Sequence, residues 1–409
     1  MTVTTEAAAT DAHGVHDVVV VGGGPAGATA ANDLAHRGRR VVLLDRAGRV
    51  KPCGGAIPPA LIREFDIPDA LLVARVTSAR MVSPAGRCVD MPIDGGFVGM
   101  VDREAFDEFL RERAARAGAQ RRTGAFVRIE RDADGVAVVH YRAPGMTGET
   151  TETVRARAVI GADGATSQVA RAEIAGADRI RYVYAYHEII RSPSVAIDGG
   201  AFDGSRCDVY YQGPLSPDFY GWIFPHGATT SVGTGTALRG FSIRNAVSAL
   251  RASSGLAGSE TIRREGAPIP MRPLKRWDNG RDVVLAGDAA GVVAPASGEG
   301  IYYAMAGGRM AAEAVDAFVT TGDVRTLAAA RRRFMRAYGR VFWILGMMQR
   351  FWYASDRRRE RFVSICRDPD VQALTWQAHM HKKLVRAKPM AHLRIFCKDL
   401  AHLAGLVRP

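Results

Sequence analysis

The stretch VVVVGGGPAGATAA, residues 18–31, runs from a β-branched segment through three glycines into an alanine-rich helical pattern. Its glycines Gly22, Gly24 and Gly27 form a GxGxxG pattern, and Asp45 closes the next apolar run. A strand, a tight turn and a helix start in this order let backbone N–H groups approach a pyrophosphate, while the acidic residue accepts from a ribose hydroxyl. The stretch therefore predicts a βαβ unit that binds a dinucleotide.

A second motif of the same kind lies in VVLAGDAAGVVAPASGEGIYYAM, residues 283–305. Asp288 ends a buried-type strand there, and glycines precede a helix that starts near Gly300. Two such motifs far apart suit a long cofactor that extends across the domain. Asp288 can accept from a ribityl hydroxyl, and the helix start can offer N–H groups to a flavin or its phosphates. Between the two motifs, VIGADGATSQVAR carries Asp163 and Gly164.

These three motifs, in this order, resemble the glutathione-reductase-type flavoproteins of the aromatic-hydroxylase branch. The resemblance implies bound FAD and brings Arg103, at the start of an amphipathic helix predicted over 102–117, close to it; a solvated arginine at a helix start is the alternative. No second GxGxxG of comparable quality is present, so NADPH is implied only by the flavin's need for electrons. The residues predicted to bind the cofactor are Gly22, Gly24, Ala26, Gly27, Asp45, Arg46, Cys53, Gly54, Gly55, Arg103, Val127, Asp163, Gly164, Gly287, Asp288, Pro295, Gly298, Gly300 and Ile301.

The composition is that of a globular protein, with 409 residues of which 47% are hydrophobic and 24% charged. The five cysteines are scattered and form no CxxC, which argues against a disulfide framework and a zinc site, so no metal is expected. Residues 1–16 lack the basic and apolar regions of a signal peptide and are interpreted as a disordered leader. No apolar run approaches the length of a spanning helix.

The pattern of strands and helices predicts an α/β fold, α+β overall. A Rossmann-type FAD-binding domain is expected from two separate segments, residues 17–175 and 271–322. An antiparallel β domain over 176–270 is inserted between them and is expected to bind the substrate. A basic helical region over 323–409 follows.

Two stretches bear on the substrate, KPCGGAIP at 51–58 and DVYYQGPLSPDFYGWIFPHG at 208–227. The second gathers aromatic rings with few charges, which suits a long apolar substrate better than a small polar acid. The alternative is that these rings form the core of the β domain. The residues predicted to contact substrate are Tyr211, Tyr220, Trp222, Phe224 and Pro225.

At these residues the sequence resembles the geranylgeranyl reductase family, most closely its chlorophyll and bacteriochlorophyll branch. The similarity runs from about Asp17 to Arg350 and includes KPCGGAIP, GMVDREAFDEFLRERAARAGA, DFYGWIFPHG and GDAAGVVAPASGEGIYYAM. It implies stepwise reduction of three isolated double bonds in the geranylgeranyl chain of a (bacterio)chlorophyll, or of geranylgeranyl diphosphate, to phytyl. Reduced FAD would be the hydride donor and NADPH the electron source. The APAS segment at 294–297 favours the bacteriochlorophyll side.

The chemistry of an isolated alkene requires a proton as well as a hydride. The developing positive charge would be stabilised by nearby ring faces in a site that excludes water. Cys53, Tyr220, His226 and a water are the candidate proton donors, and Cys53, Tyr220 and Trp222 are the predicted catalytic residues. We expect Cys53 and Tyr220 at the flavin end of an apolar channel. A role for Cys53 in filling space alone is the alternative.

The basic residues are concentrated at one end of the chain. From Arg331 onwards there are 18 Lys and Arg against 5 Asp and Glu, which accounts for the whole net charge of +13. An apolar stripe from Phe334 to Trp352 lies between two arginine runs, and HKKLVRAKPMAHLRIFCKDL at 381–400 repeats the mixture. This predicts peripheral attachment to the anionic cytoplasmic face of a photosynthetic membrane, with contact to pigment-synthesis enzymes. A helix that packs its stripe on the protein is the alternative, and no motif indicates nucleic acid.

Two other functions remain open from the sequence. An FAD-dependent aromatic hydroxylase of the same fold would need an oxygen-activating pocket and a polar group for a phenolate. A non-catalytic flavin-binding assembly protein would bind FAD without turnover. The motifs at 51–58 and 208–227 favour the prenyl reductase.

Overall fold

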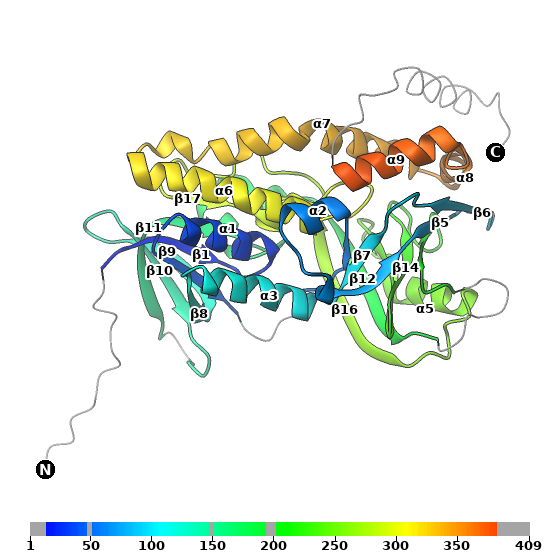
Figure 1. Cartoon of the computed structure of the whole chain (residues 1–409), viewed down its shortest axis with the longest axis horizontal. Coiled ribbons are helices and arrows are strands. Elements are labelled where there is room, and N and C mark those ends of the chain that lie inside the picture. The colour runs from blue at the N-terminus through cyan, green and yellow to red at the C-terminus, as the bar shows by residue number, and fades with distance from the viewer. Residues whose placement is uncertain (1–13, 47–50, 148–149, 194–201, 383–409) are drawn as a thin grey trace, which may run out of the picture.

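The computed structural model describes residues 14–46, 51–147, 150–193 and 202–382. In it, two seven-stranded sheets lie at opposite ends of the molecule, and long helices run along one side of both (Figure 1). The expected mixed α/β architecture is confirmed. In the part of the chain that is described, every helix is too short or too polar to traverse a lipid bilayer.

The first sheet has the order β8-β2-β1-β11-β10-β9, with β17 also paired to β11. Its parallel strands are β1 (His16–Val21), β2 (Val41–Asp45), β8 (Gln120–Thr123), β11 (Glu152–Gly161) and β17 (Val283–Leu285). The strands β9 (Ala125–Arg131) and β10 (Ala137–Arg142) are antiparallel to one another, and β10 is antiparallel to β11, so they form an antiparallel excursion from the parallel strands. β17 pairs in parallel with β11 although more than a hundred residues separate them, so this sheet is built from two distant segments of the chain.

Helices α1 (Pro25–His36), α3 (Arg103–Arg116), α4 (Gln168–Glu173) and α6 (Ile301–Thr321) surround this sheet. Short 3₁₀ turns cover Asp69–Leu71, Ala177–Arg179, Gly287–Ala290 and Val324–Thr326. α3 begins where predicted, because the Asp102 carboxylate accepts from the backbone N–H groups of Glu104 and Ala105. α1 and α6 pack backbone to backbone: a Cβ on Gly308 would lie 2.2 Å from the Ala26 carbonyl oxygen.

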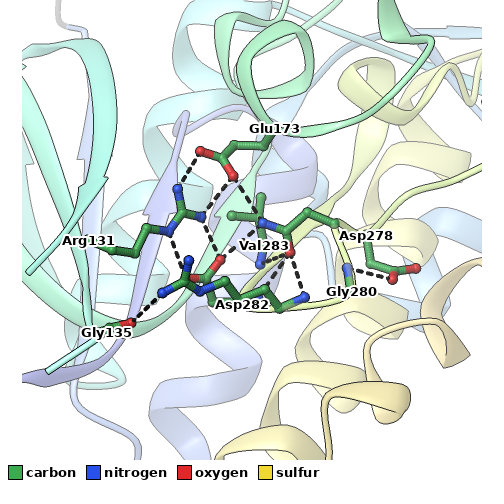
Figure 2. Close-up of polar contacts among 9 residues, drawn as sticks. Arg131, Gly135, Glu173, Asp278, Gly280, Asp282 and Val283 are labelled. Atoms are coloured by element: carbon green, nitrogen blue, oxygen red, sulfur yellow. Dashed lines mark hydrogen bonds and ion pairs between the residues drawn. The ribbon is translucent and has the colours of Figure 1, made fainter.

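A polar network holds the start of β17, at Asp282 and Val283. Figure 2 shows the Arg131 guanidinium between the carboxylates of Glu173 and Asp282, with four N–H···O contacts of 2.6–3.0 Å. Asn279 donates to both carboxylates. The hydrogen bonds to Glu173 and then Asp282 raise the pKa of Arg131 despite its burial. The network fastens β17, and hence the turn that follows it, to the antiparallel excursion.

The second sheet has the order β16-β12-β15-β14-β13-β5-β6. Its strands are β5 (Ser78–Val82), β6 (Cys88–Pro92), β12 (Tyr182–Arg191), β13 (Arg206–Tyr210), β14 (Gly221–His226), β15 (Thr229–Thr236) and β16 (Thr261–Pro270), and α5 (Ile243–Ser253) packs on one face. The sequence-based boundary differs here: β5 and β6 lie within 17–175, yet β5 pairs in parallel with β13 of the second sheet. A strand pattern alone does not specify its partner, which is a long-range contact.

A third, small sheet joins the two domains. It contains β3 (Ala56–Ile57), β7 (Val98–Val101) and β4 (Leu72–Val76), and α2 (Pro59–Glu64) follows β3. β3 is formed by the end of the KPCGGAIP stretch and pairs with β7, which leads directly into α3. The stretch is thereby held between the two large sheets.

The C-terminal helices are α7 (Ala329–Trp352), α8 (Asp356–Ile365) and α9 (Pro369–His381). The helical region expected over 323–409 is interrupted after Trp352, and Ser355 caps the next helix. The predicted apolar stripe faces the protein: Phe334 is fully buried in the first core and Trp352 is buried against the second sheet. Arg359 is also buried, and it donates to the Tyr353 carbonyl oxygen at 2.6 Å. The basic segment expected over 381–400 lies outside the described residues beyond Lys382.

Candidate functional site

The first glycine-rich turn, between β1 and α1, has the shape that a dinucleotide phosphate needs. Gly22 has φ +104°, and a Cβ there would lie 2.4 Å from the Ala162 carbonyl oxygen. A Cβ on Gly27 would lie 1.9 Å from the Gly22 carbonyl oxygen, so the turn can only be made by glycine at both places. At Gly24 a Cβ would meet nothing within 4 Å, and α1 begins there without a side-chain cap. Open space therefore faces an uncapped helix N-terminus, which attracts anions.

Asp45 ends β2 beside this turn, as the sequence predicts. Its carboxylate lies 3.4 Å from an Arg111 nitrogen, and the same arginine donates to the Gly23 carbonyl oxygen at 3.3 Å. Arg46 is exposed, directly after Asp45. Val127 lies on β9, half-buried, in the same sheet. Asp45 is thus positioned to accept from a ribose, with Arg111 as a neighbour.

The second glycine-rich turn lies against the first. A Cβ on Gly287 would be 2.7 Å from the Ala26 Cβ, so the two turns are in contact through small residues. The Asp288 carboxylate is buried and paired with Lys51, which the sequence places 237 positions earlier. A Cβ on Gly300 would be 3.9 Å from the nearer carboxylate oxygen of Asp288.

α6 starts at Ile301, also without a side-chain cap, so a second helix N-terminus opens beside Asp288. The segment before it is tightly constrained: Ala296 has φ +62° and Gly298 has φ +65°. Pro295 is buried at the same bend. This arrangement offers one carboxylate and free helix N–H groups at one place, as a long dinucleotide cofactor would require.

The Asp163-Gly164 pair has a structural task. The Asp163 carboxylate accepts from the backbone N–H groups of Gln168 and Val169 at 2.7 and 3.2 Å, and from the Ser167 hydroxyl. Burial raises the pKa of Asp163, and these hydrogen bonds oppose that rise. Gly164 has φ +86° and open space at its Cβ position. The carboxylate therefore holds the start of α4, while the backbone of the pair lies over the turn at Gly22.

The KPCGGAIP stretch packs on the end of β14. A Cβ on Gly54 would lie 3.2 Å from the Phe224 ring. At Gly55, with φ +68°, a Cβ would lie 2.5 Å from His226 Nε2. Both glycines thus allow the backbone to approach β14, the strand that carries Trp222 and Phe224. His226 Nδ1–H donates to the Phe224 carbonyl oxygen at 3.0 Å, and burial lowers the pKa of the imidazole.

Cys53 lies in a cationic environment that the sequence does not reveal. The Gly55 N–H donates to Cys53 Sγ at 3.4 Å. The guanidinium of buried Arg103 interacts with the same side chain and is itself held by Asp107 through two contacts of 2.9 and 2.7 Å. Burial would lower the pKa of Arg103, but Asp107 and then Cys53 raise it above its usual value. The Gly55 N–H therefore donates to the sulfur, and the Arg103 cation is a neighbour of the same side chain.

Tyr220 links this region to the second glycine-rich turn. Its hydroxyl donates to the Ser297 carbonyl oxygen at 2.6 Å, and a Cβ on Gly298 would lie 3.0 Å from that hydroxyl. Burial raises the pKa of Tyr220, and Tyr353 and Cys53 are among the neighbours that raise it further. The structure thus brings Cys53, Tyr220 and the turn before α6 together from three distant parts of the chain.

The aromatic strand presents one continuous face. The rings of Tyr220 and Trp222 are 6.1 Å apart, and those of Trp222 and Phe224 are 6.2 Å apart. They alternate along the chain and so share one side of β14. Tyr211 joins them, 6.2 Å from Tyr220, and all four belong to one cluster with the C-terminal helices. Pro225 is buried but alternates with Phe224, which directs it to the opposite face.

The alternative interpretation of these rings as core is thus partly right. Tyr211 is buried between Tyr353 and Phe362 of the C-terminal region. Trp222 donates through Nε1 to the Ser231 hydroxyl at 3.0 Å, which fixes its ring. Tyr220 and Phe224 are the members that reach the segments at 51–55 and 295–298.

Sequence reasoning missed several residues that shape the site. Lys51, Asp107 and Arg111 contact the predicted residues Asp288, Arg103 and Asp45. The spacing of Arg103 and Asp107 by four positions on a helix is an ion-pair signal that was available. The C-terminal contacts to Ala296, from Gln349 and from the Tyr353 hydroxyl, carried no sequence signal.

The residues present fit FAD. Two uncapped helix starts, an open face at Gly24, and carboxylates at Asp45 and Asp288 match the phosphates and hydroxyls of an extended dinucleotide. Among the residues described, no group of three or more His, Cys, Asp or Glu side chains could hold a metal ion.

Comparison with known proteins agrees with this geometry. Residues 16–191 match the family described as pyridine nucleotide-disulphide oxidoreductase, and residues 228–390 match the family described as lycopene cyclase protein. The chain is 60% identical over 394 residues to a geranylgeranyl diphosphate reductase of Rhodobacter capsulatus, covering 96% of this chain and 99% of the relative. A chloroplastic geranylgeranyl diphosphate reductase of Oryza sativa is 38% identical, with 94% of this chain and 86% of the relative covered.

Among solved structures, a geranylgeranyl bacteriochlorophyll reductase-like protein from Thermoplasma acidophilum has a TM-score of 0.78 at 22% identity, covering 92% of this chain and 99% of that one. A p-nitrophenol 4-monooxygenase from Pseudomonas putida has a TM-score of 0.68 at 18% identity, covering 90% and 98%. At these identities the likeness establishes the fold alone, which flavin-dependent enzymes of different chemistry share.

Proposed function

The chain belongs to the geranylgeranyl diphosphate reductase family, and from this we propose that it is a flavin-dependent oxidoreductase that saturates three isolated double bonds of a geranylgeranyl chain, producing phytyl. The observation that carries the proposal is the 60% identity to the Rhodobacter reductase over nearly the whole of both chains. The contact between the KPCGGAIP stretch, the aromatic strand and the turn before α6 supports it. The substrate is geranylgeranyl bacteriochlorophyll, geranylgeranyl chlorophyll or geranylgeranyl diphosphate.

The cofactor is bound by the two glycine-rich turns. Gly24 and the start of α1 hold the pyrophosphate, Asp45 the adenosine ribose, and Asp288 with the start of α6 the flavin part. When bound and reduced by NADPH, FAD supplies the hydride. We assign no NADPH-binding residue in this chain.

We assign the proton to Cys53. Its sulfur accepts from the Gly55 N–H and has the Arg103 cation as a neighbour, so the S–H takes no part in either interaction and can point toward an alkene. When the proton moves to carbon, the same two donors stabilise the thiolate that remains, and water then restores the thiol. Tyr220 is a weaker candidate because its hydroxyl is engaged by Ser297 and burial raises its pKa.

The aromatic face contributes in two ways. The rings of Tyr220, Trp222 and Phe224 offer negative π faces to the carbon that becomes positive as the proton arrives. They also present an apolar surface along which an isoprenoid chain can move, so that successive double bonds reach the same point. Tyr220 additionally positions the turn at Ser297–Gly298 through its hydrogen bond.

The test is an anaerobic turnover experiment with the purified full chain. The flavin spectrum is recorded, and NADPH is supplied with geranylgeranyl bacteriochlorophyll and, separately, with geranylgeranyl diphosphate. Successive products each heavier by two hydrogens are expected by mass spectrometry. NADPH oxidation only in the presence of oxygen, with a hydroxylated product, would establish a hydroxylase, and bound FAD without any turnover would establish a non-catalytic protein.

A matched pair of variants tests the proton assignment. Cys53→Ala removes the thiol and is expected to abolish turnover while flavin binding persists. Cys53→Ser retains a small polar group of higher pKa and is expected to restore little of the rate. Tyr220→Phe is expected to lower flavin affinity more than the rate of reduction. Normal turnover by both cysteine variants would remove Cys53 from the mechanism.

We further propose that the enzyme works on the cytoplasmic face of a photosynthetic membrane, where prenylated pigments are held and other pigment-synthesis enzymes are within reach. The positive charge of the C-terminal region supports attachment to anionic lipid.

A further inference from the structure

One face of α7 points outward along most of the helix. Arg332, Arg336, Arg340, Trp343, Met347 and Arg350 are three or four positions apart, so they lie on one side of the helix. All six are exposed, and the exposed fractions are 64% for Trp343 and 47% for Met347. We call these six residues the α7 outer face. It is opposite to the buried stripe of Phe334, Phe342 and Trp352.

The charge on this face is uncompensated. α7 contains six arginines and no acidic residue. Arg331 donates to the Leu274 carbonyl oxygen and Arg333 pairs with Glu313, which accounts for two of the six. For the side chains of the other four, all on the outer face, no hydrogen bond or ion pair is found within the described part of the chain. On neighbouring α8, Arg357 and Arg358 are exposed as well, whereas Asp356 is paired with Arg359.

The order of side chains along the face is informative. Three arginines precede the Trp343 and Met347 pair, and one follows it. A tryptophan and a methionine in water are costly for a soluble surface, but the boundary between lipid headgroups and acyl chains accommodates both. Arginines one to three turns away reach lipid phosphates with paired N–H groups. Nucleic acid would use the cations but gives Met347 no partner.

We propose that the α7 outer face docks this protein on an anionic lipid surface, with Trp343 and Met347 inserted at the headgroup boundary and Arg336, Arg340 and Arg350 on lipid phosphates. The inference deepens the membrane attachment proposed above and replaces the stripe from Phe334 to Trp352, which the structure buries. The test of this proposal measures membrane binding. A protein that does not bind vesicles can still be the proposed reductase, and a protein without turnover can still dock on vesicles.

The first experiment is flotation of the full-length, FAD-loaded protein with vesicles of phosphatidylcholine alone or with 30% phosphatidylglycerol. Binding is expected only to the anionic vesicles and is expected to be lost at high salt. The variant Arg336→Gln/Arg340→Gln/Trp343→Ser is expected to lower the partition coefficient at least about 25-fold, since each cation contributes about fivefold. Turnover of detergent-dispersed substrate is expected to be unchanged.

The matched control removes two other exposed arginines, whose side chains have no partner among the described residues, and one exposed apolar residue outside α7. Arg179→Gln/Arg181→Gln/Ile262→Ser does so, with Ile262 48% exposed on β16. It is expected to change binding less than fivefold. If both variants lose vesicle binding equally, the loss results from the change in net charge alone, and the proposal is overturned. Full binding by the α7 variant would also overturn it.

A second readout locates the contact. Trp222, Trp277 and Trp352 are buried and Trp376 is partly covered, so quenching by lipids brominated near the headgroup reports mainly on Trp343. Quenching is expected in the wild type and is expected to fall in Trp343→Phe, which keeps binding. If the wild type instead fails to bind vesicles but forms a dimer that the α7 triple variant disrupts, the face is a self-association surface and the proposal is wrong.

Discussion

Replacing Arg103 by methionine, first alone and then together with Asp107→Leu, should separate the effect of Arg103 on stability from its effect on catalysis. Arg103 and Asp107 are 6% and 7% exposed and joined by two short contacts, so removing the cation leaves a buried carboxylate without its partner. Breaking such a pair costs about 3–5 kcal/mol, a large share of the roughly 5–15 kcal/mol that stabilises a domain. Arg103→Met/Asp107→Leu removes both charges and should recover most of that loss.

The rate should not recover with the stability. A hydrogen bond to a charged group contributes about 1.5–3 kcal/mol, so loss of the Arg103 contact to the Cys53 thiolate should slow the reduction of each double bond about 10- to 150-fold in both variants.

The assays are urea unfolding and single-turnover reduction of geranylgeranyl bacteriochlorophyll. Glu112→Leu/Arg116→Met removes an exposed ion pair on the same helix, 53% and 63% exposed, and should change stability by about 0.5 kcal/mol or less. A double variant that is stable and turns over at the wild-type rate would refute the role assigned to Arg103.

Three further outcomes follow from other contacts. Gly298→Ala should destabilise the protein by about 2–3 kcal/mol in thermal unfolding and weaken FAD binding, because φ is +65° and the new Cβ would lie 3.0 Å from the Tyr220 hydroxyl. The control Gly86→Ala has φ +77° and open space at the Cβ position, so it should destabilise the protein by only about 1 kcal/mol. Burial lowers the pKa of His226 below 6.5, so the unfolded state binds more protons than the folded state at pH values between the two pKa values. The contribution of His226 to stability should therefore rise with pH through that window and be constant on either side of it. His226→Gln should flatten this part of a pH-stability profile, and an unchanged profile would contradict the assignment. Arg131→Met should lower the free energy of unfolding in urea by about 3–5 kcal/mol, because the carboxylates of Glu173 and Asp282 lose their cation. A decrease below about 1 kcal/mol would show that the network in Figure 2 does not anchor β17.

Local patterns were sufficient for much of the first domain. The βαβ unit, the helix that became Arg103–Arg116, the antiparallel excursion and the returning strand Val283–Leu285 were each predictable because period, capping and glycine position act within a few residues. The pairing of β5 with β13 was not, since the two strands are more than a hundred residues apart and either sheet could accept them. The same holds for the stripe on α7: the sequence identifies an apolar side, but only packing shows whether protein or solvent faces it.

For the site, the motifs were informative about which backbone segments matter and less so about the side chains. Gly22 and Gly27 have steric needs that the pattern itself encodes. Asp163 is a residue of the predicted motif, yet its carboxylate accepts from the Gln168 N–H at the start of α4. This local hydrogen bond competes with any bond from the carboxylate to a ligand. Cys53 and Arg103 are fifty positions apart, and their contact arises because β7 pairs with β3 and leads straight into α3. Chemistry made by such long-range contacts leaves no periodic trace in the sequence.

α7 makes two sets of contacts, one on its inner side and one on its outer side. On its inner side the Gln349 carboxamide oxygen accepts from the Ala296 N–H at 3.3 Å, and the Tyr353 hydroxyl, one residue beyond the helix, donates to the Ala296 carbonyl oxygen at 3.2 Å. Ala296 has φ +62°, a conformation unfavourable for alanine, so the turn before α6 depends on being held from outside. On the outer side Met347 and Arg350 flank Gln349 in sequence. The two sides of α7 thus make separate contacts, and Gln349→Ala should weaken FAD binding by several-fold with little effect on vesicle flotation. Loss of flotation without loss of FAD would contradict this division of α7 into an inner and an outer side.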